Sequence, residues 1–147
     1  MTDQSPDGIP IPDTVRTFLD DTRYGSIATL DPDGMPRPVV TWYTLVGDGI
    51  ILSSAVGRRW PTNLLRDPRM SLTVIDAADA YRWVGMTGIA TRIGDQARAQ
   101  ADIAGMARRY RAHDLEGAER TIVERYQRQE RISFRFRPLT IYDYDDR

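Results

Sequence analysis

Alternation of apolar and polar residues predicts a series of short β-strands in the first two thirds of the chain. Turn-forming sequences at residues 31–34 and 47–49 separate the first three strands, which indicates a meander of hairpins. The second strand is apolar on both faces, so we expect both faces to be covered. Gly85 and Gly88, inside the fifth strand, suggest bulges or the close approach of a ligand. The predicted strands span residues 24–30, 36–46, 50–54, 70–75 and 81–93.

Helical periodicity replaces this alternation at several places. Val15, Phe18 and Leu19 follow i, i+3, i+4 spacing and predict a short helix capped by Asp13. A second short helix is expected over residues 58–66, ending before Pro68. Two helices follow residue 95, separated by a loop at 113–117. The face expected to be buried on them comprises Ala97, Ala101, Ala104, Met106, Ala107, Tyr110, Ile122, Val123 and Tyr126.

Residues 131–137 return to strict alternation and predict a sixth strand, and residues 140–144 are a candidate seventh. Six or seven strands with one helical excursion before the last pair predict a mainly β domain with helices (α+β), built as a small antiparallel barrel. The length of 147 residues fits one domain, and the chain shows no internal repeat. We expect a flexible, proline-rich N-terminal arm at residues 1–12 and a single domain over residues 13–147.

Composition excludes several kinds of chemistry. All 20 basic residues are arginine, there is no cysteine, and His113 is the single histidine. A Schiff base and a Walker phosphate loop both need lysine, and thiol catalysis and thiolate zinc sites need cysteine. An enzyme of this composition would therefore rely on a bound cofactor for its chemistry. A GC-rich coding sequence explains the missing lysine as well as a functional reason does.

Charge and hydropathy bear on location and partners. The formal net charge of −1 provides no overall field that would attract nucleic acid. The first 12 residues lack the basic start and apolar centre of a signal peptide, and no apolar run approaches the ~20 residues that span a bilayer. Absence of cysteine fits a reducing compartment. We therefore expect a cytoplasmic protein that binds neither nucleic acid nor membrane.

The strongest candidate site is the segment that begins Gly57-Arg58-Arg59. Unpaired amides at the start of the predicted helix and two adjacent guanidinium groups would favour an anion. The alternative is a solvated, arginine-rich connector. The segment follows a strand ending in Ser53-Ser54 and lies close in sequence to the aromatic stretch Thr41-Trp42-Tyr43. A phosphate clamp beside a platform for a flat ring is typical of a cofactor site.

The order of these motifs resembles that of the pyridoxamine 5′-phosphate oxidase-like, flavin-binding split barrels. The similarity runs from residue 15 to about residue 142 and is carried by the strand 26–30, the turn 31–36, the strand 39–43 and the segment 58–70. Within that family the chain most resembles the oxidoreductases that use the deazaflavin coenzyme F420. The resemblance implies a homodimeric split barrel of six to seven strands, with two cofactor sites in the subunit interface and a small-molecule substrate.

The resemblance also assigns cofactor-binding positions. Backbone of the segment 37–42 would line the ring, residues 53–54 would lie near the ribityl chain, and residues 58–63 would hold the phosphate. Tyr81 and Trp83 would reach the ring from the partner subunit. The family usually has a lysine at the position of Trp60. Here the Trp60 side chain would either pack over the cofactor tail or serve as a buried anchor of the fold. The assigned residues are Arg37, Val39, Val40, Thr41, Ser53, Ser54, Arg58, Arg59, Trp60, Thr62, Asn63, Tyr81 and Trp83.

These observations lead to the hypothesis of an F420-dependent oxidoreductase that transfers hydride to an electron-poor small molecule. An FMN-dependent enzyme of the same fold, either a flavin reductase or pyridoxamine-phosphate-oxidase-like, and a non-catalytic cofactor-binding module are the alternatives. No metal site is expected and no side chain is assigned as catalytic, since His113 falls in a polar loop between helices. Trp42 and Trp83 are more readily explained as barrel core than as cofactor platforms, whereas for Tyr81 both roles are left open.

Overall fold

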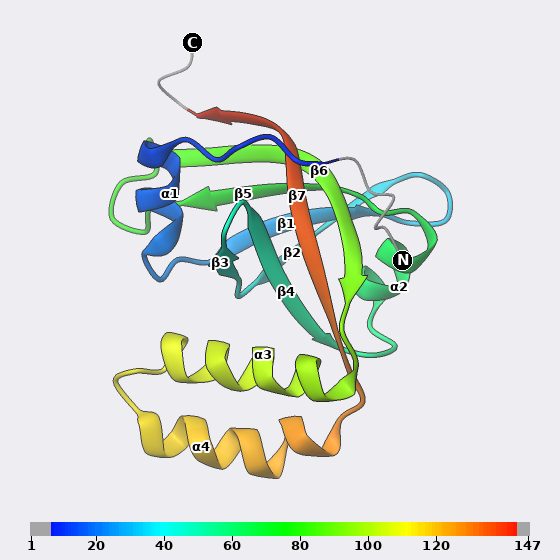
Figure 1. The fold of residues 1–147 in the computed structure, drawn as a ribbon, viewed down its shortest axis with the longest axis vertical. Coiled ribbons are helices and arrows are strands. Elements are labelled where there is room, and N and C mark those ends of the chain that lie inside the picture. Colours follow the sequence, from blue (N-terminus) through cyan, green and yellow to red (C-terminus); the bar gives the residue numbers. More distant parts are fainter. Residues whose placement is uncertain (1–6, 144–147) are drawn as a thin grey trace.

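The fold is known from a computed structural model, which describes residues 7–143 (Figure 1). Its strands are β1 (Gly25–Leu30), β2 (Pro36–Thr41), β3 (Thr44–Val46), β4 (Gly49–Ala55), β5 (Arg69–Ile75), β6 (Trp83–Ile93) and β7 (Arg131–Asp143). Its helices are α1 (Asp13–Asp20), α2 (Arg59–Arg66), α3 (Gln96–Tyr110) and α4 (Leu115–Glu124), followed by the 3-10 turn η1 (Tyr126–Arg128). No helix in this part of the chain is both long and apolar enough to cross a bilayer.

The seven strands within residues 7–143 form one antiparallel sheet in the order β2-β1-β5-β6-β7-β4-β3. The predicted α+β class and antiparallel barrel are therefore confirmed. The segments 131–137 and 140–144, expected as separate strands, form a single strand up to Asp143, because β6 is long enough to pair with both. The register of the β6–β7 pairing shifts between Thr87 and Gly88 of β6.

The two glycines of β6 accommodate protein atoms. A Cβ built on Gly88 would lie 2.1 Å from the carbonyl oxygen of Arg137, so the backbone of β7 occupies that space. A Cβ on Gly85 would lie 2.5 Å from the ring of Tyr142. Of the two predicted explanations, a bulge agrees with the register shift at Gly88, whereas the group that closely approaches both glycines is β7 rather than a ligand.

The predicted strand 36–46 is wrong as a single element. Its first part, β2, and its last part, β3, lie at opposite edges of the sheet. The Cα atoms of Thr41 and Thr44 are three peptide units apart and can be separated by at most roughly 11 Å. Six inter-strand spacings would place the edges of a flat sheet roughly 29 Å apart. The sheet must therefore curl until its edges meet, and this curl makes the half-barrel.

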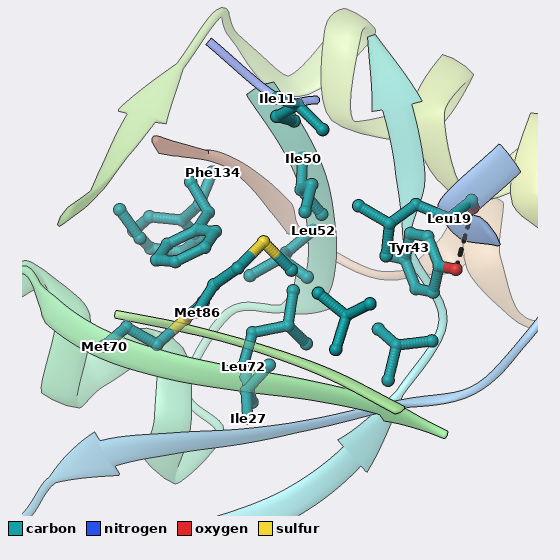
Figure 2. Close-up of a cluster of buried hydrophobic side chains, with 14 of the residues drawn as sticks. Ile11, Leu19, Ile27, Tyr43, Ile50, Leu52, Met70, Leu72, Met86 and Phe134 are labelled. Atoms are coloured by element: carbon teal, nitrogen blue, oxygen red, sulfur yellow. Dashed lines mark hydrogen bonds between the residues drawn. The ribbon is translucent and has the colours of Figure 1, made fainter. Parts of the chain in front are cut away.

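The barrel core fills the inside of this curl (Figure 2). Tyr43, in the short connection between the edges, is fully buried there, and its hydroxyl donates to the Leu19 carbonyl at 2.8 Å. That bond ties α1 to the barrel closure. The apolar residues labelled beside Tyr43 in Figure 2 are Ile11, Leu19, Ile27, Ile50, Leu52, Met70, Leu72, Met86 and Phe134.

Helix α1 buries Val15, Phe18 and Leu19, as the periodicity predicts. Asp13 is its first helical residue rather than its cap; Pro12 precedes the helix and makes no side-chain capping bond. The described part of the expected N-terminal arm, residues 7–12, contacts the barrel. The Ile9 amide donates to the Pro138 carbonyl, and Ile11 is 4% exposed. Residues 1–6 of that arm lie outside the described residues.

A helical hairpin connects β6 to β7, with α3 lying between α4 and the sheet (Figure 1). Asp95 and Asp114 cap its two helices, so the second begins at Leu115, three residues earlier than expected. The buried face of α3 is rotated from the predicted one: Ala97 and Ala101 are exposed. Its buried residues are Ala99, Ile103, Met106, Ala107 and Tyr110. On α4, Val123 is exposed, whereas Ile122 is buried as predicted.

Candidate functional site

A pocket of about 310 Å³ lies between the barrel and the helical hairpin. Strands β2 and β4 form one wall, α3 another, and the segment from the end of α4 to the start of β7 closes it. The lining residues are Tyr24, Val40, Thr41, Trp42, Ser53, Ser54, Arg58, Ile103, Met106, Arg125, Tyr126, Gln129 and Arg131.

The aromatic side of the pocket is built on Trp42. Its ring stacks on Tyr110 with centroids 5.0 Å apart and an interplanar angle of 11°. The Tyr110 hydroxyl in turn accepts from the Tyr43 amide at 3.2 Å and donates to the Arg23 carbonyl. Burial raises the pKa of the Tyr110 phenol, which stays protonated at neutral pH. The half-buried Trp42 is therefore a fixed, flat surface in the pocket wall and lies outside the barrel core.

The polar side of the pocket centres on Arg131, the first residue of β7. Its side chain is 6% exposed and spans the pairing between β7 and β4. Nη2 donates to Ser53 Oγ at 3.2 Å and Nη1 donates to Gln129 Oε1, while Nε has no hydrogen-bond partner. Burial lowers the pKa of Arg131 to about 10, and repulsion from Arg58 and Arg125 acts in the same direction. Its guanidinium carbon lies 5.1 Å from the ring centroid of Tyr126.

Charge in this pocket is uncompensated. Arg58, Arg125 and Arg131 line it, and none of its lining residues in the described chain is Asp or Glu. Elsewhere a half-buried arginine has carboxylate partners: Arg23 lies 3.1 Å from Asp76 and 3.2 Å from Asp21. Guanidinium groups with free donors, arranged beside a flat aromatic surface, are suited to a ligand with a planar ring and an anionic group.

Five of the residues assigned from the resemblance meet in this pocket, from three different segments. They are Val40, Thr41, Ser53, Ser54 and Arg58. Ser53 and Ser54 are buried in β4, whereas Val40 is 69% exposed at the open edge of β2. The sequence motifs thus converge on one cavity, although they are separated by up to 18 positions along the chain.

Three other assigned residues lie away from the lining. Arg37 and Arg59 both contact Asp31, Arg37 Nε at 3.0 Å and Arg59 Nη1 at 3.6 Å. The side-chain hydrogen bond from Asn63 holds the pKa of Asp31 below its usual value, with Arg37 and Arg59 adding to the effect. Val39 packs against the barrel core. The adjacent arginines of the motif are therefore divided, with Arg58 at the pocket and Arg59 at Asp31.

Residues in and before α2 support the site from within the fold. Trp60 is 5% exposed, and its ring lies 6.0 Å from that of Phe134 in the barrel core. Asn63 is 1% exposed and donates from Nδ2 to Thr29 Oγ1 at 3.1 Å and to Asp31 Oδ1 at 3.0 Å. Thr62 Oγ1 donates to the Arg58 carbonyl at 2.7 Å. These contacts fix the start of α2 and the position of Arg58.

Tyr81 and Trp83 line a different pocket, of about 360 Å³, beside α1. Trp83 is half-buried and meets Tyr142 edge-on, with centroids 6.0 Å apart and planes at 78°. Tyr81 is 71% exposed. Their contribution to the cofactor site of a partner subunit stays a prediction.

Sequence reasoning missed the wall supplied by the helical hairpin and β7: Ile103, Met106, Arg125, Tyr126, Gln129 and Arg131. Arg131 begins a strand in which arginine alternates with apolar residues, a pattern that suggests a solvated face. The useful signal would have been the pairing of β7 with β4, which places Ser133 opposite Ser53 and Arg131 opposite Ala55. No local pattern reveals that pairing.

Comparison with known proteins places this fold and pocket in a family. Residues 11–144 match the family model described as pyridoxamine 5′-phosphate oxidase. The chain belongs to this family of split barrels, which confirms the resemblance seen in the sequence. No curated protein sequence matches the chain significantly.

Solved structures share the fold at low sequence identity. An F420 reductase is 21% identical with a TM-score of 0.71, over 90% of this chain and 98% of that one. A conserved hypothetical protein from Mycobacterium tuberculosis is 22% identical with a TM-score of 0.71, over 99% and 92%. A heme storage protein from Vibrio cholerae is 19% identical with a TM-score of 0.66, over 92% and 95%. Proteins that share this fold thus include an F420 reductase and a heme storage protein.

Proposed function

We propose that this protein is an F420-dependent oxidoreductase that transfers hydride to an electron-poor small molecule, and that it acts as a homodimer. The observation that carries the proposal is the single pocket in which a fixed aromatic surface, Trp42, faces a cluster of arginines without carboxylates. Coenzyme F420 and FMN each join a flat ring to an anionic tail, so the residues present fit either group. Similarity to an F420 reductase supports the deazaflavin.

The chain's own residues would bind and orient the cofactor. Arg58, placed at the start of α2 by the Thr62 and Asn63 contacts, would hold the anionic tail. The open edge of β2 at Val40 and Thr41 would offer backbone groups to the ring. When bound, either cofactor supplies the hydride-transfer chemistry that no side chain here provides. The pocket lining contains no histidine or carboxylate, so we assign the proton to solvent.

FMN remains the second candidate, because the pocket's charge and shape serve both cofactors. Similarity to a heme storage protein makes heme a third candidate ligand. Heme iron is usually held by histidine, cysteine, methionine or tyrosine. The chain has no cysteine, and His113 is exposed in the loop between α3 and α4, outside this lining. Within one chain, this pocket therefore offers neither a histidine nor a thiolate ligand for heme iron.

Titration of the purified protein with F420, FMN and heme tests the proposal. We expect F420 to bind with micromolar affinity or better, and its reduced form to be reoxidised when candidate acceptors are added with the protein. Replacing Arg58 by glutamine should weaken cofactor binding by about 1.5–3 kcal/mol, the range for a charge-assisted hydrogen bond. Arg92→Gln, on an exposed side chain outside the pocket, is the matched control.

Each ligand result has a different consequence. Binding of FMN with no binding of F420 would replace the deazaflavin by the flavin alternative. If neither F420 nor FMN binds, the proposed oxidoreductase function is rejected. Tight heme binding would then favour a heme-binding role for this protein. Tight F420 binding without reoxidation by a broad acceptor panel would favour the non-catalytic module.

A further inference from the structure

The pocket of about 360 Å³ beside α1, called here the α1 pocket, is separate from the pocket between the barrel and the helical hairpin. It lies where α1 meets the connection from β5 to β6, the start of β6 and the end of β7 (Figure 1). The two pockets share no lining residue. The volume of the α1 pocket falls within the range of small-molecule sites, about 300–1,000 Å³. Its walls therefore have room for a ligand of their own.

Two carboxylates line the α1 pocket without a basic partner. Asp143, at the end of β7, has a buried Oδ1 with no hydrogen-bond partner. Asp79, in the connection from β5 to β6, is exposed and accepts from the Tyr81 amide at 3.0 Å. Within the described chain neither carboxylate forms an ion pair with a basic residue. Because a carboxylate oxygen withdrawn from water is costly, a cation placed beside this wall would be stabilised.

Arg82, the basic residue in the described lining, is already paired. Its Nη1 lies 3.1 Å from Asp76 Oδ2. Asp76 also lies 3.1 Å from Arg23, which in turn lies 3.2 Å from Asp21. These two arginines and two aspartates compensate one another. The negative charge of the two lining carboxylates is left over, so the α1 pocket favours a positive ligand.

Aromatic and aliphatic side chains form the rest of the wall. Phe18 and Val15 come from the buried face of α1, and the half-buried Trp83 begins β6. The guanidinium carbons of Arg23 and Arg82 lie 4.1 and 5.6 Å from the Phe18 ring centroid, so this ring already attracts cations. The negative ring faces act in the same direction as the carboxylates. The wall as a whole suits a positive group joined to an apolar body.

We propose that the α1 pocket binds a small organic amine in its ammonium form, with an aromatic or aliphatic body. Asp143 and Asp79 accept from the ammonium group, while Trp83 and Phe18 pack against the body. The proposal goes beyond the proposed function, because it concerns a different pocket and a ligand of the opposite charge. Whereas the pocket between the barrel and the hairpin combines an aromatic wall with arginines, the α1 pocket combines one with unpaired carboxylates.

Titration of the ¹⁵N-labelled protein with benzylamine and with benzyl alcohol at pH 7, followed by NMR, tests the charge preference. The two probes have the same ring, but the alcohol lacks the charge. We expect the amine to bind about tenfold more tightly or better. Its shifts should centre on the amides of Phe18, Trp83 and Val84 and leave that of Trp42 unchanged. Equal affinities for the two probes, or shifts centred on Trp42, would overturn the proposal.

Variants separate recognition from general electrostatics. Asp143→Asn should weaken benzylamine binding by about tenfold or more. Asp20→Asn is the matched control: it removes the same charge from α1, but Asp20 is exposed and outside the lining, so we expect less than about a twofold change. Equal losses for the two variants would overturn the proposal. Arg82→Gln should strengthen binding severalfold because it removes a like charge, and weaker binding would show that the pocket prefers anions.

Asp79→Asn keeps the test decisive if Asp143→Asn does not fold. Asp79 is exposed, and asparagine retains an acceptor for the Tyr81 amide. The variant should weaken benzylamine binding severalfold, and unchanged affinity would overturn the two-carboxylate site. The outcome is separable from the proposed function, because F420 and FMN report on the other pocket. Benzylamine binding without either cofactor would reject only the oxidoreductase, whereas cofactor binding without benzylamine binding would reject only the present inference.

Discussion

Replacing Trp60 by alanine distinguishes the two roles that its position in the sequence allows. In the structure the side chain is 5% exposed and packs against Phe134. A buried tryptophan removes roughly 150–250 Å² from water, and at about 25 cal/mol per Å² this burial contributes about 4–6 kcal/mol. Alanine substitutions of buried aromatic residues cost about 3–5 kcal/mol. We therefore expect a loss of about 3–5 kcal/mol in the free energy of unfolding.

Urea denaturation followed by circular dichroism measures this loss without relying on the fluorescence of the removed residue. In a thermal scan the midpoint should fall by roughly 10–20 °C for a domain of this size. Leu65→Ala is the matched control, because it shortens a large apolar side chain on the same helix that is 59% exposed. We expect that variant to lose less than about 1 kcal/mol.

The reasoning is refuted if Trp60→Ala is as stable as the control. It is also refuted if the variant keeps its stability but loses affinity for F420 or FMN, since Trp60 would then contact the cofactor tail. Trp60→Lys restores the residue type usual in the family. We expect it to be at least as destabilising as alanine, because it would place an ammonium group where Phe134 and the core now pack.

Three further predictions concern the hairpin, acid stability and assembly. Tyr110→Phe removes the hydroxyl that hydrogen-bonds to the backbone of Tyr43 and Arg23. We expect it to lower the free energy of unfolding by about 1–3 kcal/mol and to speed amide hydrogen exchange in α3. Unchanged exchange would contradict an anchoring role. The side-chain hydrogen bond from Arg69 lowers the pKa of Asp67 to about 2, below its unfolded value of 3.8. Its stabilising contribution is present above pH 3.8 and lost as pH falls toward 2, so the stability difference between wild type and Asp67→Asn should shrink over that interval in acid titrations. Light scattering should give a dimer mass, and a monomer that binds F420 fully would contradict a site shared between subunits.

Local pattern predicted most elements of the fold because burial of one face leaves a direct record in the sequence. The α1 face at Val15, Phe18 and Leu19 is an example. Pattern failed where pairing over long distances decides the outcome. Residues 36–46 are largely apolar on both faces, yet β2 pairs with β1 and β3 pairs with β4, and nothing in the segment itself marks the change of partner.

The candidate site shows the same division. Ser53, Ser54 and Arg58 follow one another along β4 and the start of α2, so a motif in a single stretch of sequence reveals them. Arg131 lies 73 positions beyond Arg58 and enters the pocket through the pairing of β7 with β4. Alternation identifies Arg131 as a strand residue, but only the neighbouring strand determines whether it meets solvent or a pocket.

The sheet order also determines when the pocket can form during synthesis. In the described chain β4 pairs only with β3 and β7, so the hairpin of β3 and β4 joins the remaining strands through β7. Because β7 is synthesised after the other six described strands, a nascent chain that ends before residue 131 can pair β1, β2, β5 and β6 but has no partner strand that joins β4 to them. Ser53 and Arg58 therefore remain apart from their pocket partners until β7 has been synthesised. A chain shortened from its C-terminus would be expected to lose ligand binding before it loses its first four paired strands.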